Sequence, residues 1–400
     1  MNLFFEQYFN QALDNLRAEN RFRDFTNISR ICGEFPYAIN NDNGKKIVIW
    51  CSNDYLGMGQ NPQAISSAKN ALDQYGIGAG GTRNISGNNA LIENLEDLIA
   101  KHHCKEAGLV FGSGYSANDG TIQALARIIP NLTIFSDKKN HASIISGIKH
   151  SGLTKHVFAH NDLQNLTDLL QNYSLNHPKI IIFESVYSMD GDFGKIQEIV
   201  EIAKKFNALT YIDEVHAVGL YGKTGAGLSE LLNLQNQIDI IQGTFAKGYG
   251  AVGGYITAKE NIIKAIRSFA SPFIFSTSMP PAILSAIINN VQFLQNSNVE
   301  RKILFDNVAK VKNALLKNNI KIFPNDSHII SVMVGDPILA KNISQKLLND
   351  FNIYIQHINY PTVAKGDERL RITPSALHND QMIADLVSAL TQIFKEVVQN

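Results

Sequence analysis

The sequence predicts an α/β protein with a mostly parallel central sheet, helices on both of its faces, and a smaller C-terminal α+β domain. Between residues 105 and 258, short apolar runs alternate with helical stretches, which is typical of a sheet buried on both faces. From about residue 280, long helices dominate the pattern. We therefore expect an N-terminal helix and arm (1–46), a large domain (47–285) and a small domain (286–400).

The elements follow in order along the chain. Apolar side chains at helical spacing predict a helix over 2–19, and a turn signal at 40–46 precedes a predicted strand at 47–52. The large domain carries the predicted strands 107–111, 132–136, 156–160, 179–185, 208–213, 238–244 and 252–258. Predicted helices lie between many of them, for example 141–150, 162–173 and 195–206.

The small domain begins with a long helix after Pro280 and Pro281, because proline is tolerated in the first turn of a helix. The expected elements after it are a helix at 300–317, a strand at 328–334, a helix at 337–350, strands at 352–358 and 369–373, and a helix at 379–396.

Charge and composition argue against several classes of function. The chain has 36 Lys and Arg against 36 Asp and Glu, with no polybasic run, so we expect no nucleic-acid partner and no docking on an anionic membrane. No apolar stretch of about 20 residues predicts a membrane span, and the N-terminus lacks the pattern of a signal peptide. The three cysteines form no metal-ligand pattern, so we expect no metal and reduced thiols in a cytosolic compartment. Because the pattern of a signal or transit peptide is missing, we expect a cytoplasmic, bacterial location, with a mature organellar form as the alternative.

Four polar residues fall at the ends of predicted strands: Ser136, Glu184, Asp213 and Thr244. Ligands of open α/β sheets bind outside the carboxyl ends of the strands. Asp213 could pair with the pyridinium nitrogen of pyridoxal 5′-phosphate (PLP), and His216 could reach the phenolic oxygen of the ring. The alternative is an aspartate that caps the following turn and an ordinary hydrogen-bonded histidine.

Three further motifs accompany them. Lys247 lies in the glycine-rich stretch GTFAKGYG (243–250), where it could bind PLP or be a solvated loop residue; neither a P-loop nor a dinucleotide fingerprint is present. The stretch FGSGYSAN (111–118) could bind a phosphate at a helix N-terminus or form a tight turn. In SDKKNHAS (136–143), His141 could stack on a flat ring, or Asn140 could cap a helix with His141 in its first turn.

In this order along one sheet, the motifs resemble those of the α-oxoamine synthases, which are fold-type I PLP enzymes. The resemblance covers about residues 5–395 and includes the stretches WCSNDYLGMG (50–59), GAGGTRNISG (78–87), FESVYSMDGDFGKI (183–196), FIFSTSMPP (273–281) and RLRITP (369–374). It implies a homodimer with shared sites that condenses an amino acid with an acyl-CoA and releases carbon dioxide. GTRNISG favours glycine and succinyl-CoA, the first step of tetrapyrrole synthesis, over other substrates of the family. A scaffold or regulator without activity is the alternative of a different class.

The resemblance also implies roles for single residues. Lys247 would bind PLP covalently and move the glycine α-proton, Asp213 would pair with the ring nitrogen, and His141 would stack on the ring. PLP would also be held by Ser113, Gly114, Tyr115, Glu184, Ser188, His216 and Thr244, and from the other subunit by Ser276 and Thr277. The substrates would contact Arg21, Asn53, Thr82, Asn84, Ile85, Ser136, Lys155, Thr362 and Arg371, with Arg371 on the glycine carboxylate.

Two stretches depart from the usual family pattern. The lysine loop usually reads GTLGKAFG and here reads GTFAKGYG, so glycine and alanine have changed places around Lys247. After GTRNISG, Asn88 and Ile92 stand where the family usually has threonine and histidine.

Overall fold

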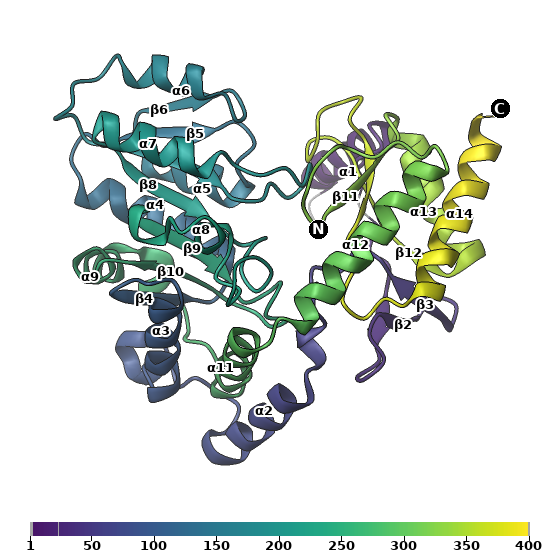
Figure 1. Ribbon diagram of the computed structural model, residues 1–400, viewed down its shortest axis with the longest axis horizontal. Helices are drawn as coiled ribbons and strands as arrows, with labels where there is room; N and C mark the ends of the chain where they lie inside the picture. The colour runs from purple at the N-terminus through teal and green to yellow at the C-terminus, as the bar shows by residue number, and fades with distance from the viewer. Residues whose placement is uncertain (1–2, 23, 399–400) are drawn as a thin grey trace. The chain divides into compact units, whose positions relative to one another are not determined.

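The computed structural model describes residues 3–22 and 24–398, which form two compact units (Figure 1). The first, here called the sheet unit, comprises residues 53–188 and 192–303. The second, here called the terminal unit, comprises residues 1–52, 189–191 and 304–400. The domain boundaries predicted at 46 and 285 stay predictions.

The sheet unit is built on a seven-stranded sheet with the order β4-β10-β9-β8-β7-β5-β6. Its strands are β4 (Ala107–Phe111), β5 (Thr133–Asp137), β6 (Lys155–Phe158), β7 (Lys179–Glu184), β8 (Leu209–Asp213), β9 (Ile240–Thr244) and β10 (Gly254–Ala258). All neighbours pair in parallel except β10, which is antiparallel to both β9 and β4. The connection from β9 to β10 is too short for the crossover that a parallel pair needs. The predicted mostly parallel sheet is confirmed.

The helices of the sheet unit lie around this sheet. They are α2 (Pro62–Tyr75), α3 (Ala90–His102), α4 (Gly114–Ile128), α5 (Ala142–Ser151), α6 (Leu163–Leu170), α7 (Ile196–Phe206), α8 (Leu228–Leu231), α9 (Glu260–Phe269), α10 (Ser271–Ile274) and α11 (Pro281–Asn296). Single-turn helices lie at Met58–Gln60, Arg83–Gly87 and Gln235–Gln237. The helices predicted at 141–150, 162–173 and 195–206 correspond to α5, α6 and α7.

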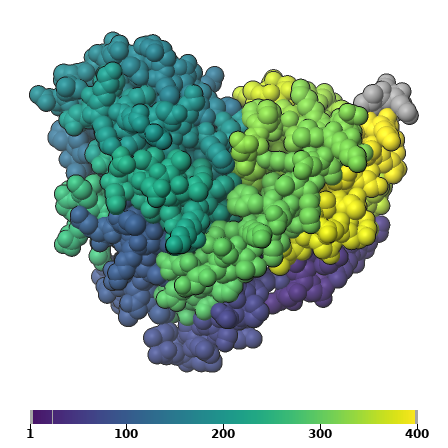
Figure 2. Space-filling model, viewed as in Figure 1, coloured from purple at the N-terminus to yellow at the C-terminus, as the bar shows by residue number. Residues whose placement is uncertain are grey.

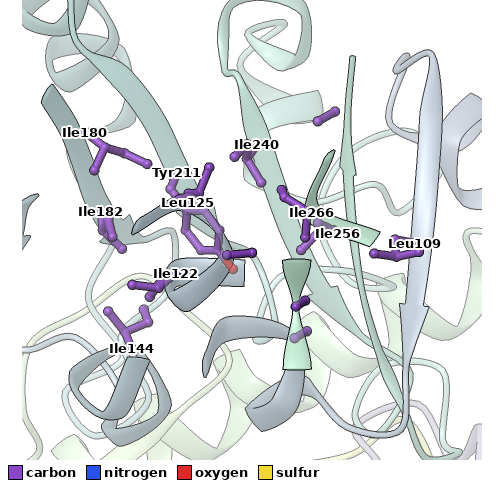
Figure 3. Packing of buried hydrophobic residues seen from close by; sticks show 14 of the residues in the cluster. Leu109, Ile122, Leu125, Ile144, Ile180, Ile182, Tyr211, Ile240, Ile256 and Ile266 are labelled. Atoms are coloured by element: carbon purple, nitrogen blue, oxygen red, sulfur yellow. The ribbon is translucent and has the colours of Figure 1, made fainter. Parts of the chain in front are cut away.

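The core of the sheet unit lies between the sheet and the helices α4, α5 and α9. Ile180 and Ile182 are two residues apart on β7, so their side chains point to the same face. Figure 3 shows this face meeting apolar side chains from the helices; its labelled residues are Leu109, Ile122, Leu125, Ile144, Ile180, Ile182, Tyr211, Ile240, Ile256 and Ile266. Helix α7 packs against β8 with its own buried apolar stripe. These contacts hold in place the helices that flank the loops at the carboxyl ends of the strands.

The terminal unit contains two small sheets, with the orders β1-β2-β3-β12 and β11-β14-β13. The strands are β1 (Ile28–Arg30), β2 (Tyr37–Asn40), β3 (Lys45–Ile49), β11 (Ile330–Met333), β12 (Ile353–Tyr354), β13 (Gln356–Ile358) and β14 (Arg369–Ile372), and the helices are α1 (Leu3–Ala18), α13 (Pro337–Phe351) and α14 (Asp380–Val398). Helix α12 (Val299–Lys317) begins in the sheet unit and continues into the terminal unit. In Figure 2 the purple N-terminal residues of this unit lie beside its yellow C-terminal residues. Strand β3 pairs in parallel with β12.

The single strand predicted at 352–358 is wrong. The stretch divides into β12 and β13, which belong to different sheets. At the break, the carbonyl of Ile355 accepts a hydrogen bond from the Ser344 hydroxyl at 2.6 Å instead of a strand partner. Among the helices that the structure describes, none is both long and apolar enough to cross a membrane.

Candidate active site

The polar residues predicted at strand ends lie along one edge of the sheet. Glu184 on β7 stands opposite Asp213 on β8, and Asp213 stands opposite Gln242 on β9. Thr244 ends β9 beside Gly254, the first residue of β10. The loops that follow β4, β5, β7, β8 and β9 therefore open toward the same place.

Asp213 is almost completely buried, with an exposed fraction of 2%. The amide of Asn118 on α4 donates to its Oδ2 at 2.7 Å, and the backbone N–H of Val215 donates to its Oδ1 at 2.9 Å. The Tyr211 hydroxyl orients Asn118 by donating to its side-chain oxygen at 2.7 Å. Asp213 thus caps the following turn, as the alternative interpretation has it, and also presents a fixed carboxylate that suits a cationic ring nitrogen.

His141 is held by the same group of side chains. The amide of Asn118 also donates to the Ser143 hydroxyl at 2.9 Å, and Ser143 contacts His141 Nδ1 through both its hydroxyl, at 2.8 Å, and its backbone N–H, at 3.2 Å. Burial, reinforced by the charge of Lys247 and opposed by Asp213, lowers the pKa of His141 below 6.5. Because Nδ1 accepts from Ser143, the proton of the neutral ring lies on Nε2.

His141 is itself the N-cap of α5, so the interpretation of Asn140 as the cap is wrong. The Asn140 amide instead donates to the Ser136 hydroxyl at 2.9 Å and to the carbonyl of Ile182 at 2.8 Å. These bonds tie the loop after β5 to the neighbouring strand β7 and leave the imidazole at the sheet edge.

Glu184 stabilises the loop after β5 through a hydrogen bond. Its carboxyl accepts a hydrogen bond from the backbone N–H of His141. Burial, together with the negative charge of Asp213, raises the pKa of Glu184 well above its ordinary value.

Lys247 lies on the loop between β9 and β10 and contacts His216. Its Nζ is 2.7 Å from His216 Nε2, while the Tyr55 hydroxyl lies 2.8 Å from His216 Nδ1. Tyr55 in turn donates to the side-chain oxygen of Asn53 at 3.1 Å. A consistent order of donors runs from Lys247 through His216 and Tyr55 to Asn53, so the imidazole gives the lysine an acceptor for one proton.

The N-terminus of α4 forms a cradle beside Thr244. Ser113 caps the helix by accepting from the backbone N–H of Ser116 at 3.0 Å, which leaves the first N–H groups of the helix directed outward. A Cβ on Gly254 would lie 2.5 Å from the Cα of Gly114, so only glycine lets the helix end lie over β10. A Cβ on Gly114 would lie 3.4 Å from Thr244 Oγ1, which shows how near the hydroxyl is.

A second histidine joins two of these loops. His160 follows β6 and bonds to Asp137 Oδ1 at 2.9 Å and to Asp192 Oδ2 at 2.6 Å. Burial lowers its pKa, but the hydrogen bonds and charges of the two carboxylates outweigh it and raise the pKa of His160 to about 9. A charged His160 therefore links the loop that carries His141 to the loop after Ser188.

The other predicted residues of the sheet unit are more scattered. Thr82 forms an isolated bridge with Thr277, and the Ser276 hydroxyl donates to the carbonyl of Pro272 at 2.6 Å. Lys155 begins β6 and lies at the amino end of that strand, away from the edge described above. On the surface lie Asn84, Ile85 and Tyr115, the last with half of its area exposed. The roles assigned to these residues stay predictions.

The terminal unit holds the remaining three predicted residues. Arg21 and Thr362 line one pocket of about 390 Å³. Arg21 pairs with Glu19 at 2.7 Å and lies over the ring of Tyr360. Arg371 lies on β14 between Ser331 and Gln356 and is largely buried.

Sequence reasoning assigned no role to Asn118, Ser143 or Tyr55. Each lies inside a quoted motif. Asn118 and Tyr55 act on residues 95 and 161 positions away in the sequence, whereas Ser143 acts on His141, two positions away. The stretch FGSGYSAN was a usable signal for Asn118, since a buried amide on the helix face toward the sheet needs polar partners.

These groups fit PLP: a lysine amine, a buried carboxylate for the ring nitrogen, and a capped helix N-terminus with a threonine hydroxyl for the phosphate. Fold and site together define a fold-type I PLP-dependent enzyme. The model of the family "Aminotransferase class I and II" matches residues 45–390. The predicted fold type and cofactor are confirmed.

Similar proteins narrow the class. The chain is 51% identical to 5-aminolevulinate synthase of Rickettsia bellii over 98% of this chain and 94% of that protein. It is 48% identical to 5-aminolevulinate synthase of Bradyrhizobium diazoefficiens over 98% of this chain and 96% of that protein. The chain belongs to the 5-aminolevulinate synthase family, which confirms the predicted function. A structure of serine palmitoyltransferase from S. paucimobilis with PLP and myriocin bound covers 100% of both chains with a TM-score of 0.91 and 27% identity.

Proposed function

We propose that the chain condenses glycine with succinyl-CoA to 5-aminolevulinate, CoA and carbon dioxide at the edge of the sheet that carries Lys247. The observation that carries the proposal is the network of hydrogen bonds that holds the Asp213 carboxylate, His141 and the Lys247–His216 pair at that edge. The chain that builds this network is about half identical to 5-aminolevulinate synthases. When bound, PLP supplies an electron sink that makes the α-proton of glycine removable.

Asp213 would keep the ring nitrogen of PLP protonated. Its Oδ1 and Oδ2 each already accept one N–H, so the carboxylate cannot rotate away. Burial strengthens its attraction for a cation in the site. The raised pKa of Glu184 beside it would disfavour a second negative charge.

Lys247 would take the proton from the glycine α-carbon on Nζ. For this step the amine must be neutral, and His216 Nε2 is placed 2.7 Å away to accept a proton from it. The hydrogen bond that His216 Nδ1–H donates to the Tyr55 hydroxyl fixes the orientation of the imidazole. His141 would lie on the ring and use its Nε2–H to bond an oxygen of the substrate, because its lowered pKa keeps it neutral.

The phosphate of PLP would bind the N–H groups at the start of α4 and Thr244. Arg371 would clamp the glycine carboxylate, since a guanidinium offers two parallel donors. Arg21 and Thr362, which share a pocket, would contact succinyl-CoA. Asn53, Thr82, Asn84, Ile85, Ser136 and Lys155 keep their proposed places around the substrates, and the cytoplasmic location remains a prediction.

A product assay tests the reaction. Purified protein with PLP and glycine receives succinyl-CoA, acetyl-CoA or a long-chain acyl-CoA, and free thiol and aminoketone are measured. We expect 5-aminolevulinate from succinyl-CoA alone; preference for another donor would overturn the substrate assignment. Lys247→Ala should lose at least about 100-fold in kcat, whereas Lys264→Ala, on the exposed face of α9, should keep full activity.

We further propose that the active form is a homodimer in which Ser276 and Thr277 complete the site of the other copy. Both side chains are exposed in the single chain. Lys247→Ala and the double variant Ser276→Ala/Thr277→Ala should each be nearly inactive. Mixed and refolded together, they should recover about a quarter of the wild-type activity, because half of the dimers would carry one intact site. Recovery would fail if all the residues of one site came from the same copy.

A further inference from the structure

The loop of Lys247 is anchored by a chain of hydrogen bonds. The proposed reaction does not use this chain. Tyr249 follows the lysine by two residues and its side chain is 1% exposed. Its hydroxyl lies 3.1 Å from Nε2 of His102, the last residue of α3, and 3.4 Å from the carbonyl oxygen of Gly225. On its other side, His102 Nδ1 lies 2.9 Å from the side-chain nitrogen of Gln295 on α11.

The donors in this chain have a definite order. The Gln295 amide can only donate through its nitrogen, so His102 Nδ1 accepts and its proton lies on Nε2. His102 then donates to the Tyr249 hydroxyl, which donates to the carbonyl of Gly225. Burial lowers the pKa of His102 to about 4 and raises that of Tyr249, so both remain neutral at neutral pH. The chain of bonds is thus intact at neutral pH.

The backbone of Tyr249 is anchored as well. Its carbonyl accepts from the Asn290 amide at 3.0 Å, and the same amide donates to the carbonyl of Met58 at 3.0 Å. Tyr249 is therefore fixed at two points, by α3 through its hydroxyl and by α11 through its carbonyl.

Only Gly248 lies between Lys247 and Tyr249, and it has no side chain. A Cβ on Gly248 would lie 2.4 Å from the carbonyl oxygen of Val218, so the loop rests directly on the turn that follows His216. Glycine also gives the backbone more conformational freedom than alanine would. An anchor at the next residue limits that freedom and holds Lys247 against His216.

We propose that Tyr249, acting through His102 and Gln295, is a positioning residue that sets the place of Lys247 relative to His216. The inference rests on the proposed function only in taking Lys247 as the residue that binds PLP. Removal of the hydroxyl would leave the N–H of His102 buried without its acceptor. The loop would then shift or loosen, and Lys247 would meet PLP less often in the right orientation.

The test is Tyr249→Phe, compared with Tyr173→Phe. Tyr173 also has its hydroxyl bonded to a histidine, His156 on the edge strand β6, but it lies outside the lysine loop. For both variants we would measure the Kd for PLP, the pH midpoint of the visible absorbance of the PLP–lysine bond, and Tm. Tyr249→Phe should bind PLP about tenfold more weakly and shift the absorbance midpoint, while Tyr173→Phe should change Tm alone.

Gln295→Leu gives a second, milder variant on the partly buried face of α11. It should weaken PLP binding in the same direction by about threefold. Unchanged PLP binding and absorbance in both Tyr249→Phe and Gln295→Leu would overturn the proposal. None of these readouts needs an acyl-CoA, so their outcome is independent of whether the product assay yields 5-aminolevulinate.

Discussion

The sheet unit and the terminal unit hold their predicted site residues in different ways. In the sheet unit, Asp213, His141 and Lys247 are each fixed by hydrogen bonds to neighbouring side chains. In the terminal unit, Arg21 and Thr362 line a pocket on the surface, and Arg21 pairs with a residue of its own segment. The predicted cofactor groups of the sheet unit are therefore preorganised, whereas Arg21 and Thr362 lie in an accessible pocket.

The largest expected effect comes from the buried network of the sheet unit. Asp213→Asn keeps the size and the hydrogen bond from Val215 but removes the charge, so it should lower kcat by about 100-fold or more. PLP titration and steady-state kinetics measure it. Asp239→Asn, at the amino end of the sheet where Asp239 bonds Thr210, is the control that should retain activity. Equal activity of both variants would contradict the role of Asp213.

An intermediate effect is expected in the terminal unit. Arg371→Lys keeps the charge but loses the paired donors, so the KM for glycine should rise about tenfold while the Kd for PLP stays unchanged. Arg369→Lys is a matched control two residues away on β14, where Arg369 pairs with Asp190 at 2.5 Å. That control should lower Tm and leave KM unaffected. A change in PLP binding by Arg371→Lys would contradict the assignment of Arg371 to the glycine carboxylate.

The smallest effect concerns the link between the loops. The pKa of His160 is raised from 6.5 to about 9, so its contribution to stability is fully present below pH 6.5 and is lost as the pH rises through 9. His160→Gln should lower Tm by about 1 to 2 °C at pH 6, and the difference should shrink toward pH 9 and above. Thermal unfolding across this range measures it, with the exposed His150→Gln as control. A difference independent of pH would show that the charge of His160 does not stabilise the loops.

Local pattern was sufficient to predict the strands of the large sheet. The run at 179–185, for example, became β7 at Lys179–Glu184, because a short continuous run of β-branched residues is typical of a strand buried on both faces of a sheet. The break at Ile355 was beyond such reasoning, since it depends on a serine on another element. For the site, motifs predicted the places of Asp213 and Lys247. The amide of Asn118, which joins Asp213 to Ser143, emerges only when α4 packs on the sheet.

Gly254 carries a consequence for how variants of this enzyme are interpreted. It has no polar side chain and lies 140 residues from Gly114, yet any larger residue there would push away the end of α4. In a genetic screen, extra vitamin B6 should restore the activity of Gly254 variants, as it should for variants of the phosphate loop. Both kinds of variant would retain PLP poorly but keep the groups that carry out the reaction. A substitution at this one position on β10 would therefore have the same effect as a shortage of vitamin B6.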